Sequence, residues 1–300
     1  MSGALLPLRA RHALITGAYG GIGAAIAARF AAEGALVTLL GRKEDRLREL
    51  CSQLPPFRDT RLAPLTAASN TNTRPSLDEK PPTHSYAVMD VSAHGRDEAV
   101  LDDIWKRTGQ IDVLVNAAGI AQFQLLQNTS PQAASELVDT NLMGTIFMSR
   151  YMAQRMKRRR ADRDADLLLS LLACIINVAS LLAEKGSPGT SVYAASKAGI
   201  IGLTHALSVE LGPLRIRTNA IVPGYIETNM LACKEHVLAL FLIRKLGFRD
   251  PTMSREPLEK RIPLGRLGRP DEVADAAVFL AQNTYANNCI LNLDGGLSAV

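Results

Sequence analysis

The feature that most constrains the fold of this 300-residue chain is a strand, a glycine turn and a helix in direct succession. Residues 12–16 have the composition of a short buried strand, and an alanine-rich helical run continues to Glu33. The glycines between them, at 17, 21 and 23, are spaced more widely than the commoner Gly-x-Gly-x-x-Gly. Such glycines let a pyrophosphate approach the backbone, and the helix N-terminus offers N–H groups and a positive dipole end. The order therefore predicts a dinucleotide site in an α/β fold.

A second pattern joins Ser180, Tyr193 and Lys197. Ser180 follows the strand-like run 174–178, and Tyr193 begins a helical segment with Lys197 four residues later. That spacing places two side chains on one helix face, a turn apart. Because an ammonium favours a nearby phenolate, we expect a lowered pKa for Tyr193, which suits proton transfer to an alcohol or carbonyl. Taken alone, such a pair is more often a surface pair; the glycine turn changes that balance.

Further motifs follow in order along the chain: Asp90-Val91, Asn116-Ala117-Ala118-Gly119, Asn141, Pro223-Gly224-Tyr225-Ile226-Glu227-Thr228 and Leu293-Asp294-Gly295-Gly296. With them the chain resembles a short-chain dehydrogenase/reductase, with a Thr-Gly-x-x-x-Gly-x-Gly turn and a Ser…Tyr-x-x-x-Lys centre, from Arg11 to about Gly296. The resemblance implies a Rossmann-type fold. We expect a doubly wound parallel sheet with helices on both faces, as one domain over residues 1–300. The arrangement is most similar to 3-oxoacyl-acyl-carrier-protein reductases and related carbonyl reductases.

The resemblance also implies roles for individual residues. Ser180 and Tyr193 bond the substrate oxygen, Lys197 assists Tyr193 and bonds the nicotinamide ribose, and Asn141 bends its helix and helps hold a relay water. No metal is expected. The positions implied to bind the cofactor are Gly17, Tyr19, Gly21, Ile22, Gly23, Arg42, Asp90, Val91, Asn116, Ala117, Gly119, Arg150, Tyr193, Lys197, Pro223, Gly224, Ile226 and Thr228.

The cofactor choice depends on the end of the second strand, expected over residues 35–40. An NAD enzyme usually carries a carboxylate there, but this chain has Gly41-Arg42-Lys43. The Arg42 guanidinium suits a 2′-phosphate, so we expect NADP(H). One departure is Gly20, which stands where many NADP-dependent relatives have a basic residue; Arg42 would act with less help.

Two regions depart from the family pattern. Residues 54–85 are rich in proline and are expected to form a mobile surface insertion. Residues 229–262 form the variable substrate region, and their apolar residues between 230 and 243 fit either a lid over a greasy substrate or a helical hairpin on the core. A long helix is expected from residue 131 to beyond 156.

Composition bounds the remaining possibilities. The net charge of +5 is a weak indication of anionic ligands, and the four cysteines lack paired or metal-type spacing, which favours a reducing compartment. No apolar run approaches the ~20 residues needed to span a bilayer. The first ten residues contain Arg9 and no acidic residue, which is typical of a mitochondrial presequence, but the segment is short for an amphipathic helix; we therefore expect the cytosol, with the mitochondrion as the alternative. The basic run 155–160 is interpreted as a solvated helix end, without nucleic acid.

The expected reaction is NADPH-dependent reduction of a 3-oxoacyl thioester to a 3-hydroxyacyl thioester, as in fatty-acid synthesis. The alternative substrates are another ketone or secondary alcohol: a steroid, sugar, polyol or secondary metabolite. A non-enzymatic scaffold remains a third possibility. An acidic carrier protein could dock on residues 155–160 or on Arg266 and Arg269. The family pattern implies a homo-oligomer, a dimer or tetramer, through the Tyr193 helix.

Overall fold

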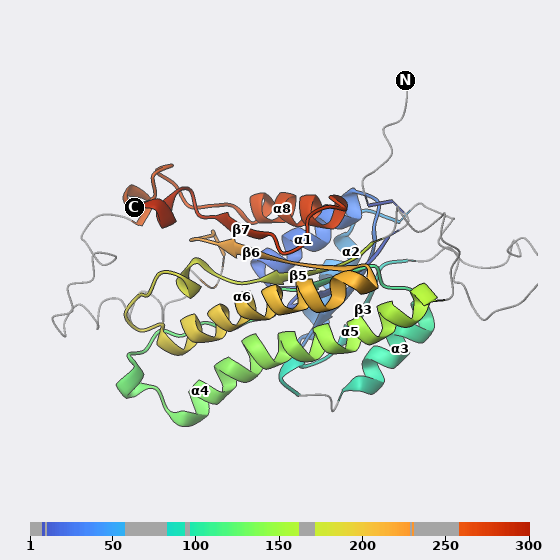
Figure 1. Cartoon of the computed structure of the whole chain (residues 1–300), viewed down its shortest axis with the longest axis horizontal. Helices are drawn as coiled ribbons and strands as arrows, with labels where there is room; N and C mark the ends of the chain where they lie inside the picture. Colours follow the sequence, from blue (N-terminus) through green and yellow to red (C-terminus); the bar gives the residue numbers. More distant parts are fainter. Residues whose placement is uncertain are drawn as a thin grey trace, which may run out of the picture.

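A computed structural model describes residues 8–9, 11–57, 83–93, 97–161, 172–228, 230 and 258–300, with side chains up to residue 157 in the helix that ends at 161. Its strands form one parallel seven-stranded sheet in the order β3-β2-β1-β4-β5-β6-β7 (Figure 1). The strands are β1 (His12–Thr16), β2 (Leu36–Gly41), β3 (Ser85–Val88), β4 (Val113–Asn116), β5 (Ala173–Val178), β6 (Ile216–Pro223) and β7 (Ile290–Leu293). The order reverses between β1 and β4, where such sheets bind ligands.

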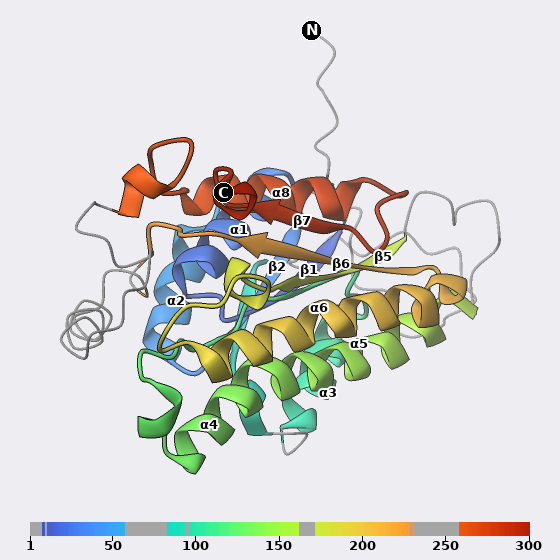
Figure 2. The same ribbon diagram turned by 60° about the vertical axis from the view of Figure 1, so that its left-hand side comes forward.

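Helices cover both faces of this sheet, as expected. One face carries α1 (Gly21–Ala32), α2 (Glu44–Gln53) and α8 (Pro270–Gln282), and the other carries α3 (Glu98–Thr108), α5 (Gly144–Ala161) and α6 (Ser191–Leu211) (Figures 1 and 2). The predicted doubly wound parallel sheet in a single domain is confirmed.

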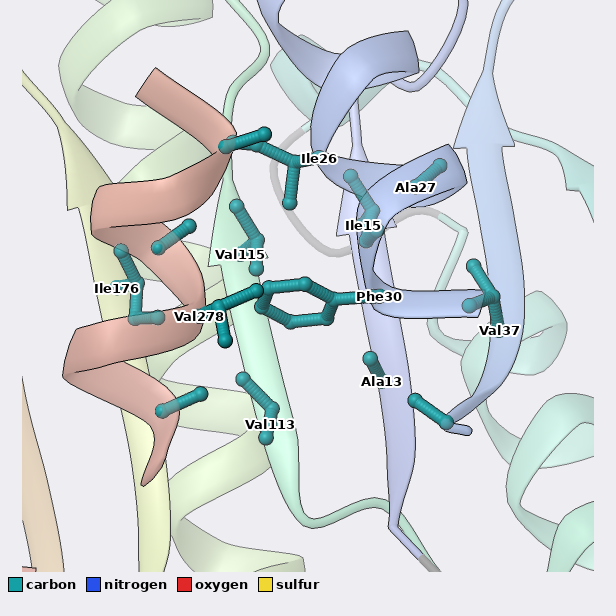
Figure 3. Packing of buried hydrophobic residues seen from close by; sticks show 14 of the residues in the cluster. Ala13, Ile15, Ile26, Ala27, Phe30, Val37, Val113, Val115, Ile176 and Val278 are labelled. Atoms are coloured by element: carbon teal, nitrogen blue, oxygen red, sulfur yellow. The ribbon is translucent and has the colours of Figure 1, made fainter. Parts of the chain in front are cut away.

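Alternating side chains of the strands feed two separate cores. Ile15 faces α1 and α8, whereas its neighbour Leu14 faces α3 and α5, as the twofold strand period requires. In the first core Phe30 of α1 is fully buried and lies between Val113 of β4 and Val278 of α8 (Figure 3). Burying an aromatic side chain in this way stabilises the folded state by up to about 3 kcal/mol. These packed layers hold the strand ends, and the loops that leave them, in fixed positions.

The expected long helix from residue 131 is present, with an interruption. It consists of α4 (Pro131–Val138), a π-helical turn (Asp139–Met143) and α5. It begins where Ser130 Oγ accepts a hydrogen bond from Ala133 N (3.1 Å) and Pro131 occupies the first turn. The π turn contains Asn141. Single π turns inside α-helices occur often at functional sites.

The predicted insertion 54–85 has wrong limits at both ends. Leu54 is buried, and Ser85 already belongs to β3. His84 ties the two ends together, because its Nδ1 accepts from Val37 N (3.1 Å) and its Nε2 contacts Pro55 O (2.7 Å). Residues 58–82, for which mobility was predicted, lie outside the described residues.

The predicted lid 229–262 also falls mostly outside the described residues, which resume at Leu258. Within the described part of the chain, no helix is long and apolar enough to cross a membrane. The cysteines in that part, Cys51, Cys174 and Cys289, are free thiols.

Candidate active site

The glycine turn between β1 and α1 lies directly against the turn that follows β4. Gly17 has a positive φ of 62°, and a Cβ there would lie 2.6 Å from Ala118 Cα. The N–H groups of Ala117 and Ala118 both donate to Thr16 Oγ1 (3.2 Å each). A Cβ on Gly23 would lie 2.4 Å from Gly17 O. Only glycine fits these positions.

The loop after β6 also contacts the glycine turn. We call the glycine turn, the turn after β4 and this loop together the cofactor cradle, or glycine cradle. Thr228 Cγ2 would lie 2.6 Å from a Cβ on Gly21, so the two predicted cofactor positions are in contact. Gly224, just after Pro223, donates its N–H to Leu293 O (2.8 Å), and Ile226 forms a β-bridge with Gly268. A cradle that side chains cannot enter, at the start of α1, fits a dinucleotide pyrophosphate.

The end of β2 brings Arg42 to the same edge. The Tyr19 ring from the glycine turn packs over Gly41, where a Cβ would lie 2.6 Å from Tyr19 Cε1. Arg42 Nη1 is 4.0 Å from Asp90 Oδ2. The other oxygen of Asp90 accepts from Ser92 N (3.0 Å) and Ser92 Oγ (2.8 Å).

Three further predicted positions have clear surroundings. Ile22 packs on the first core, and Val91 is buried against Gly144 at the start of α5. Asn116 is buried at the end of β4, where its Nδ2 donates to Asn177 Oδ1 (2.9 Å) and Ser149 Oγ (3.1 Å).

Ser180, Tyr193 and Lys197 meet at the carboxyl end of β5. Lys197 is 5% exposed, and its Nζ donates to Val178 O (2.8 Å). The same Nζ is 5.8 Å from the centroid of the Tyr193 ring. Ser180 makes a side-chain hydrogen bond with Tyr193. Lys197 and Tyr193 thus share one face of α6, as their spacing predicts.

The pKa of Tyr193 differs from our expectation. Burial raises the pKa of the phenol, and the hydrogen bond with Ser180 opposes this rise. Burial also lowers the pKa of Lys197, to about 8. Burial, and not the neighbouring ammonium, therefore sets the direction of the Tyr193 pKa shift.

Asn141 links three parts of the site. Its Oδ1 accepts from Ile120 N (2.8 Å), and its Nδ2 donates to Ile120 O (3.0 Å) and Ser196 Oγ (3.1 Å). A Cβ on Gly119 would lie 3.2 Å from Asn141 Oδ1 and 3.4 Å from Lys197 Nζ. The π turn therefore delivers its amide to the turn after β4 and to α6 together.

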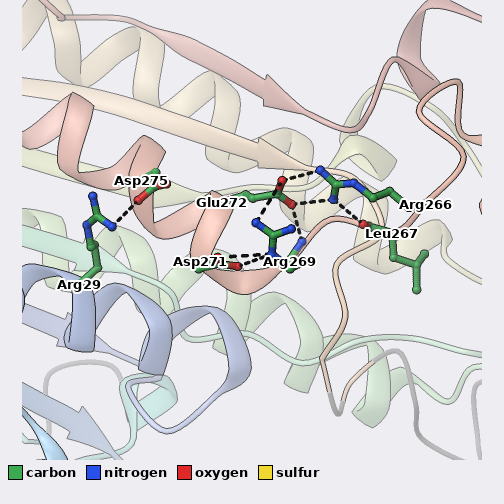
Figure 4. A network of polar contacts seen from close by, with 7 residues as sticks. All are labelled: Arg29, Arg266, Leu267, Arg269, Asp271, Glu272 and Asp275. Atoms are coloured by element: carbon green, nitrogen blue, oxygen red, sulfur yellow. Dashed lines mark hydrogen bonds and ion pairs between the residues drawn. The ribbon is translucent and has the colours of Figure 1, made fainter.

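Some predicted contacts lie elsewhere. Arg150 is at the exposed surface, where its Nη1 is 3.3 Å from Glu98 Oε1. Arg155 binds Asp102, and its guanidinium lies over the Tyr151 ring (5.2 Å). Arg266 and Arg269 contact Glu272 and Asp271 at the start of α8, near the Arg29–Asp275 ion pair (Figure 4). These arginines are therefore already paired with acidic neighbours.

No group of three or more His, Cys, Asp or Glu side chains in the described ranges is arranged to hold a metal ion.

Comparison with known proteins decides the family. A family model described as enoyl-(acyl carrier protein) reductase matches residues 59–298, and one described as short chain dehydrogenase matches residues 11–74. The chain belongs to the short-chain dehydrogenase/reductase family. It is therefore an oxidoreductase acting on CH–OH or C=O groups with a nicotinamide cofactor.

Three individual proteins illustrate the range of relatives. The chain is 34% identical to a 3-oxoacyl-[acyl-carrier-protein] reductase FabG of Chlamydia muridarum, over 96% of this chain and 97% of that one. A short-chain type dehydrogenase/reductase from Mycobacterium marinum superposes with a TM-score of 0.75 at 26% identity, covering 99% and 98% of the two chains. A gluconate 5-dehydrogenase from Burkholderia cenocepacia, in complex with NADP and tartrate, superposes at 0.74 with 30% identity and 99% of both chains.

Sequence reasoning missed several residues that shape this oxidoreductase's site, among them Thr16 and Ser196. Thr16 holds the turn after β4 through its hydroxyl, and Ser196 Oγ donates to Tyr193 O (2.7 Å) while accepting from Asn141. The position of Thr16 directly before Gly17 is a usable signal. Ser196 offers none, because its link to the rest of the site is a bond from Asn141, 55 residues earlier in the chain.

Proposed function

We propose that this protein is an NADPH-dependent reductase that converts a 3-oxoacyl thioester to a 3-hydroxyacyl thioester. The observation that carries the proposal is the meeting of Ser180, Tyr193 and Lys197 beside the glycine cradle. A proton donor and a dinucleotide site at one sheet edge are the minimum that carbonyl reduction requires.

In the proposed reaction, Ser180 and Tyr193 bond the carbonyl oxygen of the substrate. NADPH, when bound, supplies the hydride that the carbonyl carbon accepts. The Tyr193 hydroxyl gives its proton to the developing alkoxide, which completes the alcohol. Lys197 is oriented by its bond to Val178 O and stabilises the resulting phenolate, and Asn141 supports proton resupply.

NADP(H) is proposed on the position of Arg42. Arg42 directly follows Gly41 at the end of β2, and its side chain is about half exposed (51%), so its guanidinium can reach a 2′-phosphate. The NADP bound to the Burkholderia relative supports this choice. Asp90, which already neighbours Arg42, would orient the guanidinium.

The substrate class is proposed from the relatives named FabG, whose alignments span almost the whole chain. A second candidate is a sugar acid, because gluconate dehydrogenases are among the structural neighbours at similar TM-scores.

The test is NADPH oxidation, followed by absorbance, with acetoacetyl thioester, 5-ketogluconate and simple ketones as substrates. NADH and an enoyl thioester run in parallel, the latter because of the name of the larger family model. Thioester reduction with NADPH preferred supports the proposal. If only the sugar acid is turned over, the substrate assignment must change. If NADH is preferred, the cofactor assignment must change. In both cases the assignment of the catalytic residues stands.

Partners and compartment remain proposals. We propose an acyl group carried as a thioester, a homodimer or homotetramer, and the cytosol as the compartment. The free thiols of the described cysteines agree with a reducing compartment. The mitochondrial alternative depended on residues 1–10, of which the structure describes only residues 8 and 9.

A further inference from the structure

The catalytic helix α6 is capped by a residue from a distant part of the chain. Its own N-cap, Thr190, makes no capping hydrogen bond, and the Thr190 hydroxyl donates to Ser187 O (2.7 Å). Gln122 Oε1 accepts instead from Val192 N (2.8 Å) and from Tyr193 N (3.1 Å). These are the second and third helical amides, which have no acceptor within the helix and which an N-cap side chain normally binds.

The other half of the Gln122 amide fixes its orientation. Its Nε2 donates to Gln124 O (3.0 Å) and Thr129 Oγ1 (2.9 Å). Thr129 uses its own proton on Leu125 O (3.0 Å), so its oxygen must accept. If the amide were flipped, its NH₂ group would face the N–H groups of α6, and its oxygen would face the carbonyl oxygen of Gln124. Gln122 is only 5% exposed, so water cannot readily replace these bonds.

The main chain of Tyr193 is consequently held at its N–H by the loop after β4 and at its C=O by Ser196 of α6 itself. Gln122 binds its N–H, and Ser196 Oγ binds its C=O (2.7 Å) while accepting from Asn141. The Asn141 side chain in turn hydrogen-bonds to both the N–H and the C=O of Ile120, two residues before Gln122. This loop follows the small-residue turn of the cofactor cradle, so it connects the cradle to the phenol.

We propose that Gln122 is a positioning residue for Tyr193: by capping α6 it sets the place of the phenol relative to the cofactor cradle. The proposal rests on the proposed function of Tyr193 as proton donor. Its first consequence, protection of two backbone amides, can be measured without any substrate.

The test compares Gln122→Met, which keeps the side chain's length and removes the acceptor, with Gln127→Met. Gln127 is exposed in the same connection and is the matched control. In Gln122→Met, the number of rapidly exchanging amides in peptides covering residues 190–196 should increase by about two, because the N–H groups of Val192 and Tyr193 lose their acceptor. The control should match the wild type.

Kinetics then separate positioning from mere support of the fold. In Gln122→Met we expect kcat to fall about tenfold to about a hundredfold, with the Kd of NADPH unchanged, since a small displacement of a reacting group costs this much. Gln122→Glu retains the acceptor for α6 but loses the donor to Gln124 O and Thr129 Oγ1, so it should recover only part of kcat. Its negative charge should also move the alkaline limb of the pH profile upward, because a carboxylate near Tyr193 favours the neutral phenol.

Two results would overturn the proposal: amides that stay protected in Gln122→Met, or a kcat equal to that of the wild type. If Gln122→Met does not fold, as checked by thermal melting, a Gln122→Glu pH profile identical to the wild type is the contradicting result. If no substrate is turned over by the wild type, the exchange measurement still decides on the cap, while the proposed function alone fails.

Discussion

At the scale of single residues, burial of Lys197 lowers the stability of the folded protein at a position that the proposed reaction needs. Its ammonium lies in a buried position, which lowers its pKa from 10.5 to about 8. Below the folded pKa the native state must carry a desolvated charge that the unfolded chain keeps in water. Each pKa unit of difference corresponds to about 1.4 kcal/mol. Lys197 therefore destabilises the free protein at neutral pH, and the hydrogen bond to Val178 O offsets only part of this.

We predict that Lys197→Met abolishes turnover and raises the free energy of unfolding at pH 7 by about 1 to about 3 kcal/mol. As pH rises above about 8, the wild-type lysine loses its proton in the folded state. The difference in free energy of unfolding between the two proteins should therefore be about 1 kcal/mol smaller at about pH 9 than at pH 7. Urea unfolding at both pH values measures this. Lys157→Met, at an exposed lysine of α5, is the control and should change little. A variant less stable than the wild type at pH 7 would contradict this account.

At the scale of elements, the junction of β2 and α2 determines the cofactor preference. β2 ends at Gly41, which packs against the Tyr19 ring, and the next residue, Arg42, has its Nη1 4.0 Å from Asp90 Oδ2. The strand end therefore presents a cation to the glycine cradle.

We predict that Arg42→Ala weakens NADPH binding about tenfold to about a hundredfold, as expected for the loss of a charge-assisted bond, and leaves NADH binding almost unchanged. Titration calorimetry with both cofactors measures the difference. Arg46→Ala, an exposed arginine on α2 paired with Glu49, is the matched control. An equal loss for NADPH and NADH would rule out a 2′-phosphate contact.

Local patterns predicted most elements but not the features that depend on distant partners. β1 has its predicted bounds, because it is a short apolar run that ends at the glycine turn. The π turn at Asn141 is invisible to periodicity, which does not register one extra residue in a helix. Gln122 was missed because its partners on α6 are 70 and 71 residues away. The Tyr193 pKa was expected to fall because spacing shows a neighbouring charge but not burial.

At the scale of the whole molecule, α6 presents a second face to solvent. Most of the exposed residues along α6 are small or apolar, with His205 and Glu210 as the exceptions, and Val209 is 76% exposed. Ala195, Ala198, Gly202 and Ala206 precede Val209 at helical spacing on this exposed side. Such a face agrees with the proposed homo-oligomer, in which α6 packs against its copy.

We predict that Val209→Glu shifts the protein to a smaller species in light scattering coupled to size exclusion, because the carboxylate would be buried without a partner. Leu126→Glu, at an exposed apolar residue away from α6, should leave the mass unchanged. If both variants keep the wild-type mass, α6 is not the interface.

The central claim is that Tyr193 gives the proton at a centre built beside the cofactor cradle. The most direct measurement pairs turnover with NADPH binding in Tyr193→Phe, which removes one hydroxyl and keeps the ring. We predict a loss of kcat of at least about a thousandfold, at the upper range for a positioned acid, with the Kd of NADPH nearly unchanged. Turnover at the wild-type rate in this variant would contradict the account, because the proton would then come from another group.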